Sequence, residues 1–379
     1  MIKVGIFLNV PPEGGGAFQY AQCILEATQK LNYQITVFYT DLRWAQFLKE
    51  LAIESHFIKY RRSTFYFQLI YRKIGLPVSI FRALFSSLFY EFRTLSSADV
   101  DLFIFPGQDP ESYLLKLKTI STIHDLMHIY EPHYSELSST RIRNYHYQNM
   151  IKYCEIIMVD SSLGKQHVLT NYEVTGDKIK IVPFIAPHYV RNFKKTIDLK
   201  PRIKGKYLFY PAQFWSHKNH ITVLKAFQRI KNPEIKLVFS GAQKNAYNEI
   251  IQFIDEHNLK NKVEILGYIS EDDMLNLYYF AQCIVFASVC GPTNIPPVEA
   301  IMLGKPLLCS DKYAMREQCG DAALYFDPLS VDELESLINN IVGDTDLRFE
   351  LAQKALLHSC LFTVDELSRN LKLVIETAR

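Results

Sequence analysis

The stretch "CGPTNIPPVEAIMLGKP" (290–306) contains the residue types with the clearest chemistry. Asn294 is a good helix cap, and Pro296 at the first helical position loses only an N–H group that would lack a helical partner. The remaining amides at the positive end of the helix dipole can face an anion. Glu299, one turn into the helix, can accept two hydrogen bonds from a vicinal diol such as a ribose, or can simply complement the dipole. The two fixed proline dihedrals favour a preorganised site.

Three other positions follow apolar runs and could face a ligand. Gly15 and Gly16 belong to a glycine turn that lets the backbone approach a ligand, although a flexible turn would look the same. His124, with Asp125, ends an apolar run and either reaches a ligand or is a structural histidine. Lys218 is a point charge that could meet a phosphate, or is a solvated lysine at a helix start.

These residues need elements to position them, and the sequence alternates short apolar runs with amphipathic stretches in two series. Alternation of this kind predicts parallel sheets flanked by helices, here two doubly wound domains. Ligands of such sheets bind outside the carboxyl ends of the strands, so we expect a site in a cleft between the domains. The predicted strands are 3–10, 33–39, 100–107, 118–124 and 155–161, then 206–212, 235–241, 262–268, 283–288, 305–310 and 323–328, with helices such as 17–31 and 139–152.

The length of 379 residues also favours two domains. The segment 183–206 is rich in proline and lysine and is the expected boundary region. We predict an N-terminal domain over 1–190 and a C-terminal domain over 191–362. A capped amphipathic helix over 363–379 is expected to return to the N-terminal domain.

Composition narrows the class of protein. The net charge is 42 minus 40, or +2, which argues against a dedicated nucleic-acid binder. Seven scattered cysteines without a C-x-x-C pair indicate a reducing compartment and no structural zinc. The first ten residues read as a strand rather than a signal peptide, and no uncharged apolar run approaches transmembrane length. We therefore expect a cytoplasmic protein.

Two acidic patterns have competing interpretations. Asp99 and Asp101 form a D-x-D pattern that can hold a divalent metal under a diphosphate, but the pair precedes an apolar run and reads better as a polar strand entrance. Ser270 with Asp273 three residues on reads as a helix cap rather than a ligand cluster. We expect no metal.

The segment 59–95 is basic and aromatic, with seven basic residues and one acidic residue. Its charges exclude a spanning helix. It predicts either packed helices with a solvated basic side or an amphipathic surface that lies on anionic lipid.

The segment 287–328, with other positions in order along the chain, resembles retaining glycosyltransferases of family 4, the glycosyl transferases group 1, which have the GT-B fold. The family pattern is S-x-x-E-G-F-G-L-P-x-x-E-A, followed by G-x-P-V-x-x-S-D and E-x-x-G-D-A-A-x-x-x-D-P. The matching residues are Ser288, Pro296, Glu299, Ala300, Gly304, Pro306, Ser310, Asp311, Gly320, Asp321, Ala322, Ala323, Asp327 and Pro328. The "GPTNIPP" form is similar to that of transferases for bacterial surface polysaccharides.

The sequence departs from this pattern at two places. Gly291 stands where the first glutamate of the family's E-x7-E pair would be, eight residues before Glu299, and that glutamate usually touches the transferred sugar. Ala212 and Gln213 occupy the neighbourhood of an arginine that often partners the phosphate-binding lysine.

The resemblance implies a role for each matched position. Glu299 would hold the ribose of a nucleoside-diphosphate sugar, and Lys218 would neutralise the leaving diphosphate. His124 would donate a hydrogen bond to the donor sugar. The remaining donor-binding positions would be Gly15, Gly16, Gln213, Thr293, Asn294 and Ile295.

The resemblance implies a retaining hexosyltransferase that needs no metal or other cofactor, with the acceptor bound by the domain 1–190 and the nucleotide sugar by the domain 191–362. It would move a sugar, by first expectation mannose, from a GDP- or UDP-sugar to a glycan or polyprenyl-linked acceptor in O-antigen or lipopolysaccharide synthesis. We expect it in the cytoplasm, at the inner face of the membrane if 59–95 binds lipid. The alternative is an inactive GT-B subunit that binds a nucleotide or stabilises a partner transferase.

Overall fold

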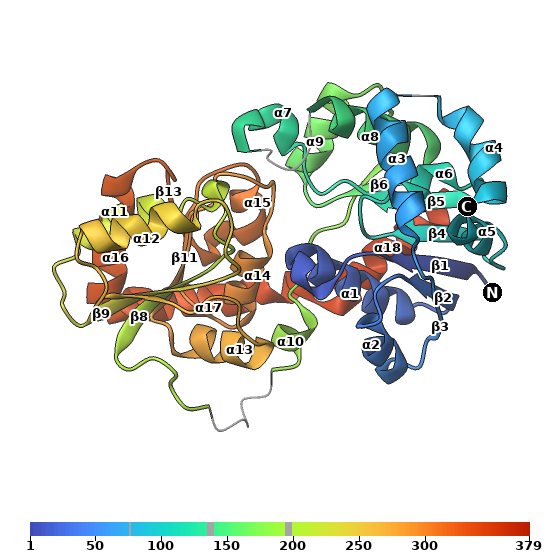
Figure 1. The fold of residues 1–379 in the computed structure, drawn as a ribbon. Coiled ribbons are helices and arrows are strands. Elements are labelled where there is room, and N and C mark those ends of the chain that lie inside the picture. Colours follow the sequence, from blue (N-terminus) through green and yellow to red (C-terminus); the bar gives the residue numbers. More distant parts are fainter. Residues whose placement is uncertain (76, 135–139, 194–198) are drawn as a thin grey trace. The chain divides into compact units, whose positions relative to one another are not determined.

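The computed structural model (Figure 1) describes residues 1–75, 77–134, 140–193 and 199–379, without the side chains of 13, 65, 72 and 83–87. The chain forms two compact units. The first contains 1–183 and 364–379, and the second contains 184–363. The division thus falls seven residues before the predicted boundary at 190, inside the segment expected to join the domains.

The first unit is built on a seven-stranded parallel sheet of order β3-β2-β1-β4-β5-β6-β7. Its strands are β1 (Lys3–Leu8), β2 (Gln34–Tyr39), β3 (Glu54–Phe57), β4 (Leu102–Phe105), β5 (Lys118–Thr122), β6 (Ile156–Val159) and β7 (Ile179–Ile181). Its helices are η1 (Pro12–Gly14), α1 (Gly16–Gln29), α2 (Trp44–Glu50), α3 (Arg62–Ile74), α4 (Val78–Leu88), α5 (Tyr90–Ser96), α6 (Glu111–Leu114), α7 (Met127–Tyr130), η2 (Pro132–Tyr134), α8 (Thr140–Tyr153), α9 (Ser162–Asn171) and α18 (Val364–Ala378).

The second unit has a six-stranded parallel sheet of order β10-β9-β8-β11-β12-β13. Its strands are β8 (Lys206–Pro211), β9 (Ile235–Ser240), β10 (Val263–Ile265), β11 (Cys283–Phe286), β12 (Leu307–Ser310) and β13 (Leu324–Phe326). Its helices are α10 (His188–Arg191), η3 (Ser216–Lys218), α11 (His220–Gln228), α12 (Tyr247–Glu256), α13 (Glu271–Phe280), α14 (Ile295–Met302), α15 (Met315–Cys319), η4 (Gly320–Ala322), α16 (Val331–Gly343), α17 (Thr345–His358) and η5 (Ser359–Phe362).

The central strands are continuous apolar runs because parallel strands covered by helices are buried on both faces. All four residues of β4, β6, β11 and β12 are buried. The two predicted series of strands are present. The sequence analysis missed β3 and β7, which lie at the two edges of the first sheet. β3 is largely exposed, and β7 has only three residues, of which one is buried, so neither forms an apolar run.

Helix α18 packs against α1 and so completes the first unit, as the red and blue helices of Figure 1 show. Its apolar stripe, which includes Leu371 and Ile375, is buried. Ser368 Oγ donates to the Ala27 carbonyl at 2.7 Å, and Lys30 pairs with Asp365 at 2.5 Å.

The acidic pair Asp99 and Asp101 lies just before β4, at the amino end of the sheet. Lys3 contacts both, because its ammonium pairs with Asp99 and its backbone N–H donates to the Asp101 carboxylate at 2.8 Å. The pair therefore lies at the edge of the sheet opposite to the strand ends where ligands of such folds bind. Ser270 caps α13 through the Asp273 amide, as predicted.

We predict that Leu371→Ala destabilises the chain by roughly 2–5 kcal/mol, because it removes buried apolar volume beneath α18. Leu373→Ala is the matched control on the same helix, since Leu373 is 64% exposed, and should change stability by less than about 0.5 kcal/mol. Equilibrium urea unfolding followed by circular dichroism compares them. Equal losses would contradict the packing of α18 described above.

Candidate functional site

Lys218 and Asn294 meet at the carboxyl ends of two neighbouring strands of the second sheet. Lys218 ends η3 after β8, and Asn294 ends the loop after β11. Lys218 Nζ donates to Asn294 Oδ1 at 3.0 Å and lies 3.4 Å from Ser288 Oγ. Both acceptors are uncharged, so they hold the ammonium without neutralising it. The site therefore presents a positive charge beside the start of α14.

The start of α14 differs in detail from the sequence expectation. Ile295 is its first residue and Pro296 its second, and the Asn294 side chain binds Lys218 instead of capping the helix. Gln318 pairs with the Asn294 backbone, accepting its N–H at 3.0 Å and donating to its carbonyl at 2.9 Å. The Asn294 amide, expected to face an anion, is thus already engaged. Thr293 and Ile295 are both buried.

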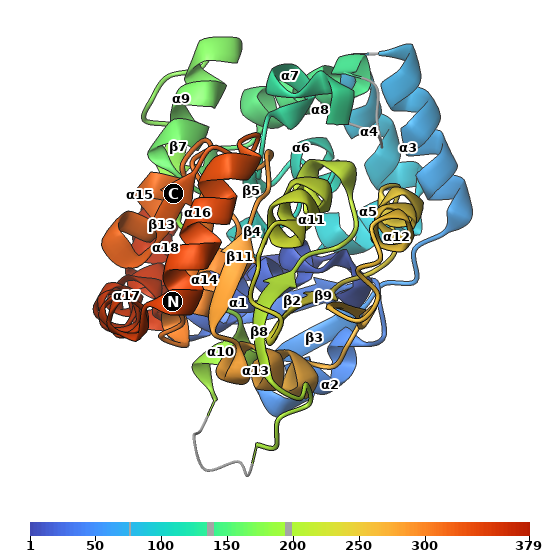
Figure 2. The ribbon, with the colours of Figure 1, turned by 90° about the vertical axis from the view of Figure 1, so that its left-hand side faces the viewer.

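Glu299 is a buried carboxylate held by two tyrosines, neither of which the sequence analysis identified. Tyr189 of α10 donates to Oε1 at 2.5 Å, and Tyr278 of α13 donates to Oε2 at 2.6 Å. Helices α10, α13 and α14 lie together in Figures 1 and 2. Burial raises the pKa of Glu299, and the two hydrogen bonds oppose that rise. Each carboxylate oxygen keeps a second lone pair with which to accept from a ligand.

Gly291 has a backbone conformation that favours glycine, with φ of +94°. A Cβ at this position would come within 3.1 Å of Asn294 Nδ2 and 3.3 Å of the Thr293 carbonyl. A glutamate here, where the resembled pattern has one, would be strained. Gln213, near the position of the missing arginine, accepts a hydrogen bond from Trp215 Nε1 at 3.0 Å.

In the first unit, Gly15 and Gly16 stand between β1 and α1, at the point where the strand order of the sheet reverses. Gly15 has φ of +60°, which suits glycine, and Gly16 is the first residue of α1. No side chain in the described part of the chain caps this helix end. The glycine turn therefore has a defined backbone conformation and leads directly into the N-terminus of α1.

His124 follows β5 and is half-buried, with its ring edge-on to Tyr20 at 5.2 Å between centroids. Burial lowers the pKa of His124, so the ring is neutral near pH 7. The ring hydrogen-bonds the backbone of Pro106, where a proline offers only its carbonyl, so a ring N–H is the donor. The second nitrogen of a neutral ring then accepts.

Asp109, which the sequence analysis missed, is a buried carboxyl in the segment after β4. Asn9 donates to Oδ1 at 3.3 Å, and Oδ2 has no hydrogen-bond partner within the described part of the chain. Burial, with the nearby Glu111 carboxylate, raises the pKa of Asp109 to about 7. No sequence pattern marks it, because its burial follows from tertiary packing.

The described residues contain no cluster of three or more His, Cys, Asp or Glu side chains that could hold a metal ion. The predicted donor residues Gln213, Lys218, Thr293, Asn294, Ile295 and Glu299 belong to the second unit, and Gly15, Gly16 and His124 belong to the first.

Residues 193–357 match the family described as Glycosyl transferases group 1. The O-antigen chain mannosyltransferase RfbU of Salmonella typhimurium is 25% identical over 228 residues, 60% of this chain and 62% of the relative. The O-antigen chain mannosyltransferase B of Escherichia coli is 22% identical over 242 residues, 61% of this chain and 63% of the relative. The chain thus covers less than two thirds of the length of these two relatives.

Solved structures share the fold over the full length. Anabaena HepE in complex with UDP-glucose has a TM-score of 0.73 at 15% identity and covers 100% of both chains. A glycosyltransferase from Rickettsia africae has a TM-score of 0.71 at 17% identity and covers 100% of this chain and 99% of its own. The two parallel Rossmann-like sheets are those of the GT-B fold, as the sequence predicted.

We predict that Asp109→Asn raises the midpoint of thermal unfolding at pH 8 and raises it clearly less at pH 5, because the effect grows as the pH rises from about 4 to about 7. The folded-state pKa of about 7 lies above the ordinary pKa of 3.8, so the folded protein binds the extra proton between these values. The stabilisation by this proton is complete below about pH 4 and is lost as the pH rises through 7. Asparagine cannot ionise, keeps an acceptor for Asn9 and removes that loss.

Asp346→Asn is the control, since Asp346 is exposed. Scanning calorimetry at both pH values measures the midpoints. A shift for Asp109→Asn that is equal at pH 5 and pH 8 would show that Asp109 does not titrate in this range.

Proposed function

We propose that this chain, whose second unit matches the glycosyl transferases group 1, is a retaining glycosyltransferase of surface polysaccharide synthesis. Its donor is a nucleoside-diphosphate sugar, with GDP-mannose the first choice because its relatives include O-antigen mannosyltransferases. Its acceptor is a glycan or a polyprenyl-linked glycan. The GPTNIPP loop is a working variant of the family's donor-binding motif.

One observation carries the proposal: an ammonium beside a helix start, with a buried carboxylate one turn along the same helix. Lys218 lies next to Asn294, the residue before α14, and Glu299 lies within α14. Binding of a diphosphate requires a positive charge. Binding of the ribose diol requires a pair of acceptor atoms at a fixed distance from that charge. A helix is rigid enough to fix that distance.

In the proposed reaction, the bond between the sugar C1 and the diphosphate oxygen breaks, and the acceptor oxygen bonds to C1 on the same face. The acceptor proton passes to the leaving diphosphate. Lys218 and the helix end stabilise the negative charge that develops on the leaving group. This scheme needs no carboxylate nucleophile, so glycine at position 291 is compatible with it.

We predict that Lys218→Ala weakens nucleotide binding and transfer at least tenfold, because a charge-assisted contact contributes roughly 1.5–3 kcal/mol. Glu299→Gln should have a similar effect through the ribose. Glutamine is preferable to alanine here because its oxygen accepts from one buried tyrosine hydroxyl and its NH₂ group can donate to the other. Lys225→Ala, on the exposed side of α11, is the matched control and should bind as the wild type does.

A thermal-shift screen with UDP, GDP, ADP and dTDP selects the nucleotide, and calorimetry with excess chelator then gives Kd for each variant. Release of sugar from the matching sugar nucleotide gives the activity. Wild-type affinity in Lys218→Ala would reject the site. Loss of all binding in chelator would restore the metal interpretation of Asp99 and Asp101. Nucleotide binding without turnover would identify the inactive-subunit alternative.

We further propose that the segment 59–95 contacts an anionic membrane. Helix α3 exposes Tyr66, Ile70 and Ile74, each more than half open to solvent. The basic residues Lys59, Arg61, Arg62, Lys73 and Arg93 are exposed in the same segment. Exposed apolar and basic side chains together suit a lipid surface.

Two residues of this segment act internally instead. The guanidinium of Arg82 donates to the Leu115 carbonyl at 3.1 Å, so this side chain makes a hydrogen bond within the protein. Glu91, the single acidic residue, is buried and accepts from the Arg61 amide at 2.6 Å. The side chain of Arg72 lies outside the described residues. Every helix in the described ranges falls short of the length and apolarity needed to cross a bilayer.

We predict that the protein binds vesicles with anionic lipid and not neutral vesicles, and that salt weakens the binding, because the attraction is screened over about 8 Å at physiological ionic strength. Replacing Arg61, Arg62 and Lys73 by glutamine should reduce binding by up to roughly a hundredfold, since each basic residue near the surface contributes about 1 kcal/mol. The control replaces Lys49, Lys116 and Lys152, which are also exposed in the first unit. Cosedimentation measures binding. An equal loss of vesicle binding in both triple variants would show that binding depends on net charge alone and not on the segment 59–95.

A further inference from the structure

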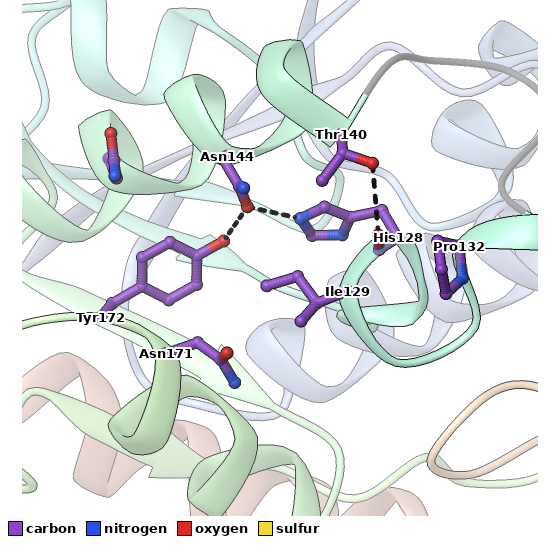
Figure 3. A pocket seen from close by; sticks show the side chains of 8 residues that line it. His128, Ile129, Pro132, Thr140, Asn144, Asn171 and Tyr172 are labelled. Carbon is purple, nitrogen blue, oxygen red and sulfur yellow. Dashed lines mark hydrogen bonds between the residues drawn. The ribbon is translucent and has the colours of Figure 1, made fainter.

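The first unit contains a pocket of about 430 Å³ that none of the predicted site residues lines (Figure 3). Its walls come from α7 and η2, from the first half of α8, and from the end of α9. The polar lining residues are His128, Thr140, Asn144, Gln148, Asn171 and Tyr172. The volume lies within the range of small-molecule sites, about 300–1,000 Å³.

Asn144 is the centre of a hydrogen-bond network in this pocket. Its Oδ1 accepts from His128 Nε2 at 2.8 Å and from the Tyr172 hydroxyl at 3.0 Å, as the dashed lines of Figure 3 show. Two donors occupy both lone pairs of the amide oxygen. The orientation of the amide is thereby fixed, and its NH₂ group is left as a donor.

The imidazole of His128 is neutral in this network. Its side chain is fully buried, and burial lowers the pKa of His128. Nε2 carries the proton that Asn144 accepts, so Nδ1 is an acceptor, and it has no hydrogen-bond partner within the described residues. Buried acceptors without partners are uncommon.

The described lining carries no formal charge, because its polar members are amides, hydroxyls and a neutral imidazole. Among these lining residues a phosphate or a carboxylate would find no cation, and a cation would find no carboxylate. Amide and hydroxyl groups beside Tyr172 and Ile129 match a molecule with many hydroxyls and an apolar face. That description fits a neutral sugar ring.

We propose that this pocket binds a neutral sugar unit of the acceptor glycan, with the NH₂ group of Asn144 donating to a sugar hydroxyl. His128 and Tyr172 are positioning residues that fix the Asn144 amide. The proposal rests on the proposed glycosyltransferase function and assigns to this chain a subsite for its second substrate.

The test uses the full chain and saturation-transfer NMR with methyl α-mannoside, methyl α-glucoside and methyl β-galactoside, with glucuronate as a charged comparison. The wild type should bind at least one methyl glycoside and not glucuronate. Asn144→Ala and Gln148→Ala should weaken that binding about tenfold, the loss expected for a hydrogen bond to a buried or partly buried group. Gln166→Ala is the matched control, since Gln166 is exposed on α9 outside the pocket lining.

Gln148 is exposed, so its replacement leaves the fold intact even if Asn144→Ala unfolds. Tyr172→Phe adds a second readout, because loss of one hydroxyl should weaken sugar binding while nucleotide Kd stays constant. The proposal is overturned if no methyl glycoside binds, or if Gln148→Ala and Tyr172→Phe bind as the wild type does. Nucleotide binding that persists in all variants separates this failure from a failure of the glycosyltransferase assignment.

Discussion

The reversal of strand order between β8 and β11 is the constraint on which the site of the second unit depends. The chain builds β8, β9 and β10 outward in one direction and then returns to place β11 on the other side of β8. The segments after β8 and β11 therefore leave the sheet side by side. This brings Lys218 to Asn294 across 76 residues of sequence. The Val289 amide joins the same two segments by donating to the His217 carbonyl at 2.9 Å.

The carboxylate of Glu299 depends on its neighbours in a different way. A buried carboxylate is costly unless its oxygens are hydrogen-bonded, and here one hydroxyl serves each oxygen. Burial and the carboxylate raise the pKa values of Tyr189 and Tyr278, so both remain protonated donors at neutral pH. Three helices are thereby fixed around one charge, and the carboxylate cannot turn freely.

Much of this architecture could be predicted from the sequence because its signals are local. Apolar runs marked the buried strands, and the spacing from Asn294 to Glu299 placed a helix start correctly to within one residue. Edge strands β3 and β7 were missed because β3 is largely exposed and β7 is only three residues long, so neither forms such a run. Tyr189 lies 110 residues from Glu299, and Gln318 lies 24 residues from Asn294, so no local pattern could pair them. The buried state of Asp109 is likewise a result of tertiary packing.

The positive φ of Gly291 bears on how this loop can vary. In the resembling pattern a glutamate stands at this position, yet any side chain here would crowd Asn294, which holds Lys218. A single exchange of glycine for glutamate would therefore disturb the lysine before it could add a new contact. The residues from Gly291 to Asn294 therefore depend on one another. Converting the GPTNIPP loop to the form with glutamate requires several coordinated substitutions rather than one.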